Sequence, residues 1–229
     1  MAAKMRTRGD CVFCGKEMTR GGLARHLAVC DKRQAVIAAA DQQKVGVNQQ
    51  LFHLQVQDAW GGDYWLHLEM NGETTLKQLD RYLRAIWLEC CGHLSRFSVG
   101  GGWGGKEVGM GAIARRTLRP GLELTHIYDF GTSSETLVKV VDVRTGHPLS
   151  QHPIYLMARN DPMTAVCQEC GQPAQWLCIE CISESDATGL LCDEHVKDHP
   201  HDNYGRPRVV VNSPRMGMCG YAGPARPPY

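Results

Sequence analysis

The chain has 229 residues, of which 43% are hydrophobic and 21% charged, so it can bury a core and is not disordered throughout. Its 25 Lys+Arg and 24 Asp+Glu give a net charge of +1, which excludes a uniformly basic nucleic-acid coat and a uniformly acidic tail protein. This length suits one medium domain with small additions. The 11 cysteines and 10 histidines fall mostly in two short stretches near the ends.

The chain shows no pattern for export or for a membrane span. No apolar run follows the basic residues that precede Cys11, so no secretory signal is expected. No apolar stretch approaches the roughly 20 residues that a membrane-spanning helix needs. We therefore expect a cytoplasmic protein without a membrane partner. In that reducing compartment, closely spaced cysteines indicate metal ligands before disulfides.

Charge is unevenly distributed and divides the chain into three regions. Residues 1–44 carry 9 basic and 4 acidic side chains, residues 45–158 carry 10 and 11, and residues 159–229 carry 6 and 9. The net charges are therefore +5, −1 and −3. We predict a zinc finger with an Ala-rich helix in 1–44, an α+β domain in 45–160, and a cross-brace zinc domain with a Pro/Gly-rich tail in 161–229.

The amino-terminal region contains the pattern C-x2-C-x11-H-x3-C. Its candidate ligands are Cys11, Cys14, His26 and Cys30. Structural zinc takes four thiolate or imidazole ligands in a tetrahedron, and a C-x2-C turn supplies two of them. His26 and Cys30 are four residues apart and share one face of a helix, so they supply the other two. The pattern resembles a zinc finger of the Cys-Cys-His-Cys type.

Zinc binding by this finger does not by itself predict that it reads DNA. The helix positions that would face bases are Thr19, Gly22 and Arg25. Gly22 has no side chain to offer, and a single finger covers only about 3 base pairs. A structural or protein-contact role is therefore favoured. Salt-sensitive, sequence-independent attraction to nucleic acid through the +5 charge remains the alternative.

The middle region has the signals of a compact mixed fold. Strands are predicted at residues 51–56, 64–70, 94–99, 122–130 and 137–143. Thr75 and Gln78 make a capping box that begins one main helix, and the apolar pattern of that helix runs to Gly92. One helix among about five short strands predicts an α+β domain, here flanked by two small zinc-binding modules.

Glycines and tryptophans in the middle region invite two further interpretations. Residues 100–111 contain seven glycines, but Lys106 is followed by Glu107 rather than by Ser or Thr. A surface loop is therefore predicted in place of a phosphate-binding loop. Packing is predicted for the tryptophans, since no basic residues alternate with them as in a base-stacking platform. These tryptophans are Trp60, Trp65, Trp87 and Trp103.

Eight further candidate ligands lie in residues 167–201. They are Cys167, Cys170, Cys178, Cys181, Cys192, His195, His199 and His201. Two tetrahedral zinc sites need this number, which makes three zinc ions with the finger. Since four ligands per ion leave no open position, we predict structural zinc and no catalytic zinc.

The order of these ligand pairs is similar to that of a B-box-like cross-brace. The resemblance implies two sets, Cys167, Cys170, Cys192 and His195 in one and Cys178, Cys181, His199 and His201 in the other. The competing assignment is a sequential arrangement, in which the first four cysteines of this region, Cys167, Cys170, Cys178 and Cys181, bind one ion together. Cys219 could replace His201 or be a plain buried thiol.

Four short motifs in residues 52–143 suggest a family. They are Leu54-Gln55-Val56, Thr75-Leu76-Lys77-Gln78-Leu79, His93-Leu94-Ser95-Arg96-Phe97 and Tyr128-Asp129-Phe130-Gly131. With them, the segment resembles the pRi-plasmid ORF-3-like family, which includes insertion-sequence passenger proteins labelled TnpR. The resemblance implies a compact α+β fold and a link to mobile genetic elements, with no reaction to carry over. The family commonly continues the last motif with Asp, then Trp and His, which residues 132–136 lack.

No nucleophile with a positioned base is evident. Residues 1–40 contain no serine for a serine recombinase, and His126 beside Tyr128 on one strand is not the arrangement of a tyrosine recombinase. We therefore predict a zinc-binding, non-enzymatic interaction module, a protein or nucleic-acid adaptor associated with mobile genetic elements and without a small-molecule substrate. The alternatives are a nucleic-acid-binding accessory acting through the basic finger, and a cryptic hydrolase or nuclease.

Overall fold

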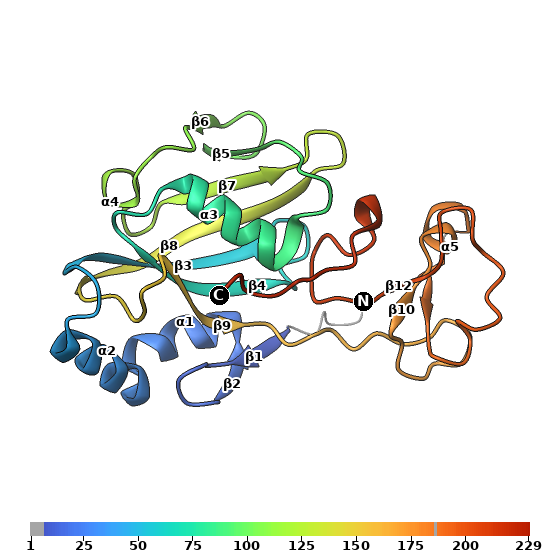
Figure 1. Ribbon diagram of the computed structural model, residues 1–229, viewed down its shortest axis with the longest axis horizontal. Coiled ribbons are helices and arrows are strands. Elements are labelled where there is room, and N and C mark those ends of the chain that lie inside the picture. The colour runs from blue at the N-terminus through green and yellow to red at the C-terminus, as the bar shows by residue number, and fades with distance from the viewer. Residues whose placement is uncertain (1–6, 186) are drawn as a thin grey trace.

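A seven-stranded antiparallel sheet forms the centre of the computed structural model, which describes residues 7–185 and 187–229 (Figure 1). The strand order is β6-β5-β7-β8-β3-β4-β9. The strands are β3 (Gln49–Asp58), β4 (Trp65–Asn71), β5 (Ser95–Val99), β6 (Lys106–Val108), β7 (Glu123–Tyr128), β8 (Ser134–Gly146) and β9 (Ile154–Arg159). The five predicted strands are confirmed, and β6 and β9 extend the sheet at its two edges. The fold mixes α and β structure, with more strand than helix.

One face of the sheet is covered by the predicted helix. It begins as α3 (Leu76–Leu83) and continues as the π-helix η1 (Arg84–Leu88). The capping box between Thr75 and Gln78 is present at its start. The prediction that the helix runs to Gly92 is wrong, because Glu89 adopts an extended backbone after η1. The side chains of Leu79, Leu83 and Ile86 are fully buried in the main core.

The opposite face of β4 and β9 is covered by the amino-terminal region. That region consists of β1 (Arg8–Asp10), β2 (Glu17–Thr19), α1 (Arg20–Val29) and α2 (Asp31–Gln43). Leu23 and Leu27 of α1 are buried in one cluster with Trp65, Met157 and Ala158 of the sheet. Arg33 of α2 also forms a buried ion pair with Glu69 of β4, at 3.2 Å. The finger therefore shares its core with the central domain.

The glycine-rich segment folds back across the sheet. The Gly102 N–H donates to Thr125 Oγ1 at 3.3 Å, and Ser98 Oγ donates to the Gly102 carbonyl at 2.8 Å. Lys106 then opens strand β6 rather than a helix, and the short helix α4 (Ala114–Thr117) comes only later. The segment thus lacks the strand-to-helix passage that a phosphate-binding loop requires.

The carboxy-terminal part has two portions that lie in different places. The first contains β10 (Trp176–Leu177), α5 (Ile179–Glu184), β11 (Leu190–Leu191) and β12 (Arg208–Val209), and it stands apart from the main sheet, in orange at the right of Figure 1. The second portion, residues 211–229 with the 3₁₀ helix η2 (Met218–Gly220), returns to the central domain. Ser213 Oγ donates to the Trp87 carbonyl at 2.6 Å, and the Tyr229 ring lies 5.7 Å from that of Tyr82. Within the described residues, every helix is too short or too polar to cross a bilayer.

Two buried histidines lie beneath the finger. His67 Nε2 is 3.1 Å from the Arg20 carbonyl, which accepts, so the other nitrogen of neutral His67 accepts from His53 Nε2 at 2.8 Å. Burial lowers the pKa of His67 to about 4 and that of His53 to about 2. Both rings are therefore neutral at physiological pH.

We expect these histidines to make the fold sensitive to acid. Between pH 6.5 and about pH 4 the unfolded chain binds protons at His53 and His67 that the folded chain does not, so stability falls as the pH drops through this interval. The loss is on the order of 3 kcal/mol per histidine. The measurement is the difference between the free energies of unfolding of wild type and of His67→Asn. This difference should become smaller as the pH falls.

The subtraction cancels proton uptake at the cysteine and histidine clusters, because both chains contain them. His152→Gln is the matched control, since its ring is exposed. The free energy of unfolding of His152→Gln should depend on pH as that of wild type does. A wild-type minus His67→Asn difference that stays constant from pH 6.5 to pH 4 would contradict the expectation.

Candidate metal centres

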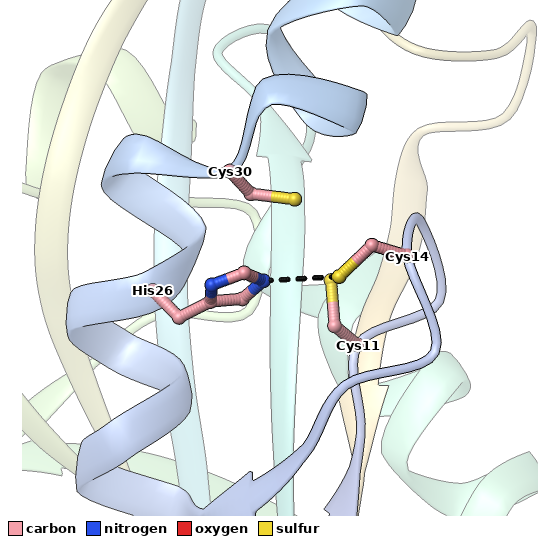
Figure 2. A group of neighbouring side chains, drawn as sticks. All are labelled: Cys11, Cys14, His26 and Cys30. Carbon is pink, nitrogen blue, oxygen red and sulfur yellow. Dashed lines mark hydrogen bonds between the residues drawn. The ribbon is translucent and has the colours of Figure 1, made fainter.

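The first centre lies in the finger, where four side chains point toward a common position (Figure 2). Cys11 and Cys14 come from the turn between β1 and β2, His26 from α1, and Cys30 from the junction of α1 and α2. Their four ligand atoms lie within 4.8 Å of one another, and Cys14 Sγ is 3.2 Å from His26 Nε2. Tetrahedral zinc with its usual bond lengths separates ligand atoms by about 3.5–3.8 Å. The centre is compatible with zinc.

Local backbone structure positions the two finger thiols. Gly15 has a φ of +69°, and its N–H donates to the Cys11 carbonyl at 2.8 Å, which closes the turn between the cysteines. Burial raises the pKa of the Cys11 thiol to about 11, whereas a backbone hydrogen bond from Lys16 lowers the pKa of Cys14. Cys11 therefore carries a proton at neutral pH that a bound dication would displace.

The second centre joins two separated segments of the carboxy-terminal part. It consists of Cys167, Cys170, Cys192 and His195. His195 Nδ1 lies 3.3 Å from Cys192 Sγ and 3.6 Å from Cys167 Sγ, and the sulfurs of Cys170 and Cys192 are 3.8 Å apart. These separations match the edges of a zinc tetrahedron, which are about 3.5–3.8 Å.

The third centre lies at the start of α5. It consists of Cys178, Cys181, His199 and His201. Cys181 Sγ is 3.2 Å from His201 Nδ1 and 3.4 Å from His199 Nε2. Gln168 Nε2 donates to the Cys181 sulfur at 3.7 Å, a contact of the kind that orients a metal-bound thiolate. The ligands of the second and third centres therefore alternate along the chain. Among the described residues, Cys167, Cys170, Cys178 and Cys181 do not form one group, as the sequential arrangement would require.

A fourth group was not assigned as a metal site from the sequence. Cys90 and His93 follow η1, and Cys219 comes from the tail, with ligand atoms within 4.8 Å of one another. Cys219 therefore does not belong to the group of His201, and the alternative of a plain buried thiol is wrong because Cys219 is exposed. The Cys90-x2-His93 spacing is a local signal for two ligands, but no local pattern indicates that the tail brings the third.

A buried ion pair lies beside this fourth group. Arg215 Nη2 donates to Asp129 Oδ2 at 2.6 Å, and Arg215 Nε donates to the Cys90 sulfur at 3.3 Å. Burial alone would raise the pKa of Asp129, but the hydrogen bond from Arg215 and those from backbone N–H groups lower it to about 2. Burial would likewise raise the pKa of Cys90, but Arg215 and Tyr128 lower it. Asp129 is therefore charged at neutral pH.

The helix face that would read DNA borders a cavity of about 660 Å³. Thr19, Gly22 and Arg25 line it from the finger side, and the β3–β4 hairpin lines it from the other side. Arg20 Nη1 donates to the Gly62 carbonyl at 3.0 Å across this boundary. The base-reading positions therefore line a cavity that they share with the central domain, and Arg25 among them is exposed.

Exposed aromatic side chains gather around the start of β8. Trp60 is 82% exposed, Trp103 47% and Phe130 44%. The rings of Trp103 and Phe130 meet edge to face with centroids 5.0 Å apart, and Trp60 borders a small pocket with Ser133 and Ser134. The packing prediction is wrong for Trp60, which is largely exposed on the β3–β4 loop, whereas Trp103 packs against Phe130 on a loop outside the core. The same prediction is confirmed for Trp65 and Trp87, which are fully buried.

Comparisons with known proteins show a similarity at the level of structure. No protein-family model matches the chain, and no curated protein matches it. The chain is similar to the crystal structure of a protein of unknown function from Methanosarcina mazei Go1, with a TM-score of 0.42 and 17% identity. The match covers 55% of this chain and 77% of that chain. Such a similarity assigns neither a family nor an activity.

Proposed function

We propose that this protein is a zinc-stabilised interaction module that binds a protein partner and catalyses no reaction of its own. The observation that carries the proposal is the exposure of three aromatic side chains near the start of β8, called here the aromatic cluster: Trp103 and Phe130, whose rings are in contact, and Trp60, which borders a pocket beside Ser133 and Ser134. Exposed apolar patches of this kind mark interaction sites on soluble proteins. Tryptophan is also enriched among the residues that dominate binding energy at protein interfaces.

Zinc has a structural role in this proposal. Each of the first three centres offers four ligand atoms, so a tetrahedral ion there has no open position for a substrate. The ligands are those predicted, Cys11, Cys14, His26 and Cys30 in the finger, and the two alternating sets in residues 167–201. In the carboxy-terminal region, the buried core is made mostly of ligands, namely Cys167, Cys178, Cys181 and Cys192 with Leu191. Two zinc ions would therefore replace the apolar core that the carboxy-terminal region lacks, and a third would add to the core that the finger shares with the sheet.

The surroundings of the aromatic cluster favour a protein partner over nucleic acid. Asp58 and Glu135 border the same pocket as Trp60, and acidic groups repel phosphate. Arg96 lies 5.9 Å from the Trp103 ring, but it also faces Glu107 at 3.9 Å. The partner that fits this surface is a segment with apolar side chains flanked by basic residues.

The position of the finger supports the same preference. Its base-reading positions border the cavity shared with the β3–β4 hairpin, which leaves that face poorly placed to enter a major groove. The free thiols of the cysteines support a reducing, cytoplasmic setting. The link to mobile genetic elements rests on the sequence resemblance to the plasmid ORF-3-like family.

Replacing the aromatic cluster should remove peptide binding. The test selects a displayed random peptide library on the full zinc-loaded chain and measures the enriched peptides against Trp60→Ser/Trp103→Ser/Phe130→Ser. Loss of one aromatic hot spot costs about 2 kcal/mol or more, so affinity should fall at least about 30-fold. Enriched peptides should combine apolar and basic residues.

The matched control is Val29→Ser/Val47→Ser, which removes exposed apolar side chains away from the cluster. It should bind the same peptides as wild type. Mixed-sequence single-stranded DNA and RNA form the second arm of the test. Binding to them that weakens steeply with salt and is lost in Arg25→Ala would contradict the protein-partner proposal and favour the nucleic-acid alternative.

A further inference from the structure

Three candidate ligand atoms meet where the tail crosses the central domain. Cys90 Sγ and His93 Nε2 belong to the segment after η1, and Cys219 Sγ belongs to η2 in the tail. All three lie within 4.8 Å of one another. Two thiols and one imidazole form a donor set that zinc prefers. This group is separate from the three centres with four ligands.

The His93 imidazole of this group has an unsatisfied nitrogen in the described structure. His93 Nε2 is buried and has no hydrogen-bond partner among the described residues. Its nearest charged neighbour is Asp129 Oδ2, at 3.5 Å, beyond the distance of an ordinary hydrogen bond. Buried polar atoms are normally paired, so an orphaned imidazole nitrogen beside two thiols points to a missing ligand.

The charges around the group balance with a dication. Thiolates at Cys90 and Cys219 with the Asp129 carboxylate would carry −3, and the buried Arg215 guanidinium carries +1. A divalent metal ion brings this sum to zero. Neutralising these charges lowers the cost of holding two thiolates beside the buried Asp129 carboxylate.

The backbone at the group is strained on both segments. Asp129 has a φ of +67° and Cys219 a φ of +49°, a region that residues other than glycine rarely adopt. Cys219 Sγ and Asp129 Oδ2 are 3.7 Å apart, so the two strained residues meet. Such conformations persist where surrounding contacts hold them, and they cluster at ligand sites.

We propose that Cys90, His93 and Cys219 bind a fourth zinc ion, which fastens the carboxy-terminal tail to the central domain. Three protein ligands leave one coordination position, and solvent can reach the group because Cys219 is exposed. The site thereby differs from the three closed centres, because it can take an added ligand such as a small anion or water.

The test counts zinc in the full chain, purified under reducing conditions, equilibrated with zinc and desalted. Cys219→Ser should hold one zinc ion fewer than wild type, and His93→Gln should give the same loss. Cys91→Ser is the matched control, because Cys91 is an exposed neighbour outside the group, and it should keep the wild-type count. The readout is the difference in zinc content between wild type and each variant. This difference does not depend on how many of the other centres are filled.

Cobalt and thiocyanate test the open position. In the cobalt-loaded wild-type chain, thiocyanate should change the visible absorption spectrum, and in cobalt-loaded Cys219→Ser it should not. Equal zinc counts in wild type and Cys219→Ser would overturn the proposal. An equal loss in Cys91→Ser would also overturn it, as would a disulfide between Cys90 and Cys219 in the reduced preparation.

Discussion

Removing zinc with a chelator should unfold residues 165–203 while the seven-stranded sheet stays folded. The buried apolar residues of that region are mostly the ligands themselves, with Leu177 and Leu191 as the buried residues that are not ligands. Structural zinc binding contributes about 10–16 kcal/mol in zinc-finger peptides, and this energy is folding energy. Hydrogen exchange read by mass spectrometry, with and without chelator, should show near-complete loss of protection in this region.

The finger should respond less, although it has the same number of ligands. Leu23 and Leu27 are buried against Trp65 and Met157 of the sheet, so part of its core persists without metal. We expect partial loss of protection in α1 and near-normal protection in β4. Cys178→Ser should reproduce the carboxy-terminal effect, and Cys91→Ser should have none. Unchanged protection of residues 165–203 after chelation would contradict a structural role for zinc.

Replacing Arg215 with leucine should destabilise the protein by about 3–5 kcal/mol. The Arg215 side chain is fully buried and donates to Asp129, to the Thr132 carbonyl and to Ser134 Oγ. Without it, the buried Asp129 carboxylate would lack its counter-ion. Since these contacts join the tail to the β7–β8 turn, tail cleavage by protease should also accelerate.

Chemical denaturation of Arg215→Leu against wild type measures the effect. Arg226→Leu is the matched control, because Arg226 is an exposed arginine in the same tail, and we expect a change within about 0.5 kcal/mol. Adding Asp129→Asn to Arg215→Leu should recover part of the lost stability, because the unpaired charge is then gone. An effect of Arg215→Leu no larger than that of Arg226→Leu would mean that the buried pair does not hold the tail.

Local patterns predicted the parts of the molecule that local forces determine. Alternating apolar residues gave the five predicted strands, and the Thr75–Gln78 box gave the start of α3, since both signals act within a few residues. Ligand spacing predicted the four finger residues, because paired ligands lie on a single turn or helix face. The alternating sets in residues 167–201 came from the resemblance to a B-box-like cross-brace, since spacing alone left a sequential arrangement open.

Contacts between distant segments could not be predicted in this way. An apolar helix face indicates burial without saying what buries it, so the packing of α1 on β4 and β9 was not foreseen. Cys219 reaches Cys90 only because the tail folds back, which no periodicity encodes. Trp60 and Trp103 are exposed because of where their loops place them, whereas the hydrophobic character of tryptophan alone favours a packed position.

Zinc bound per chain in Cys219→Ser, after desalting, tests the structural role of the three closed centres most directly. This variant lacks a ligand of the proposed fourth site and retains all twelve ligands of the finger and the two carboxy-terminal centres. We predict three tightly held zinc ions per chain. A count of one or none would contradict a scaffold held together by zinc.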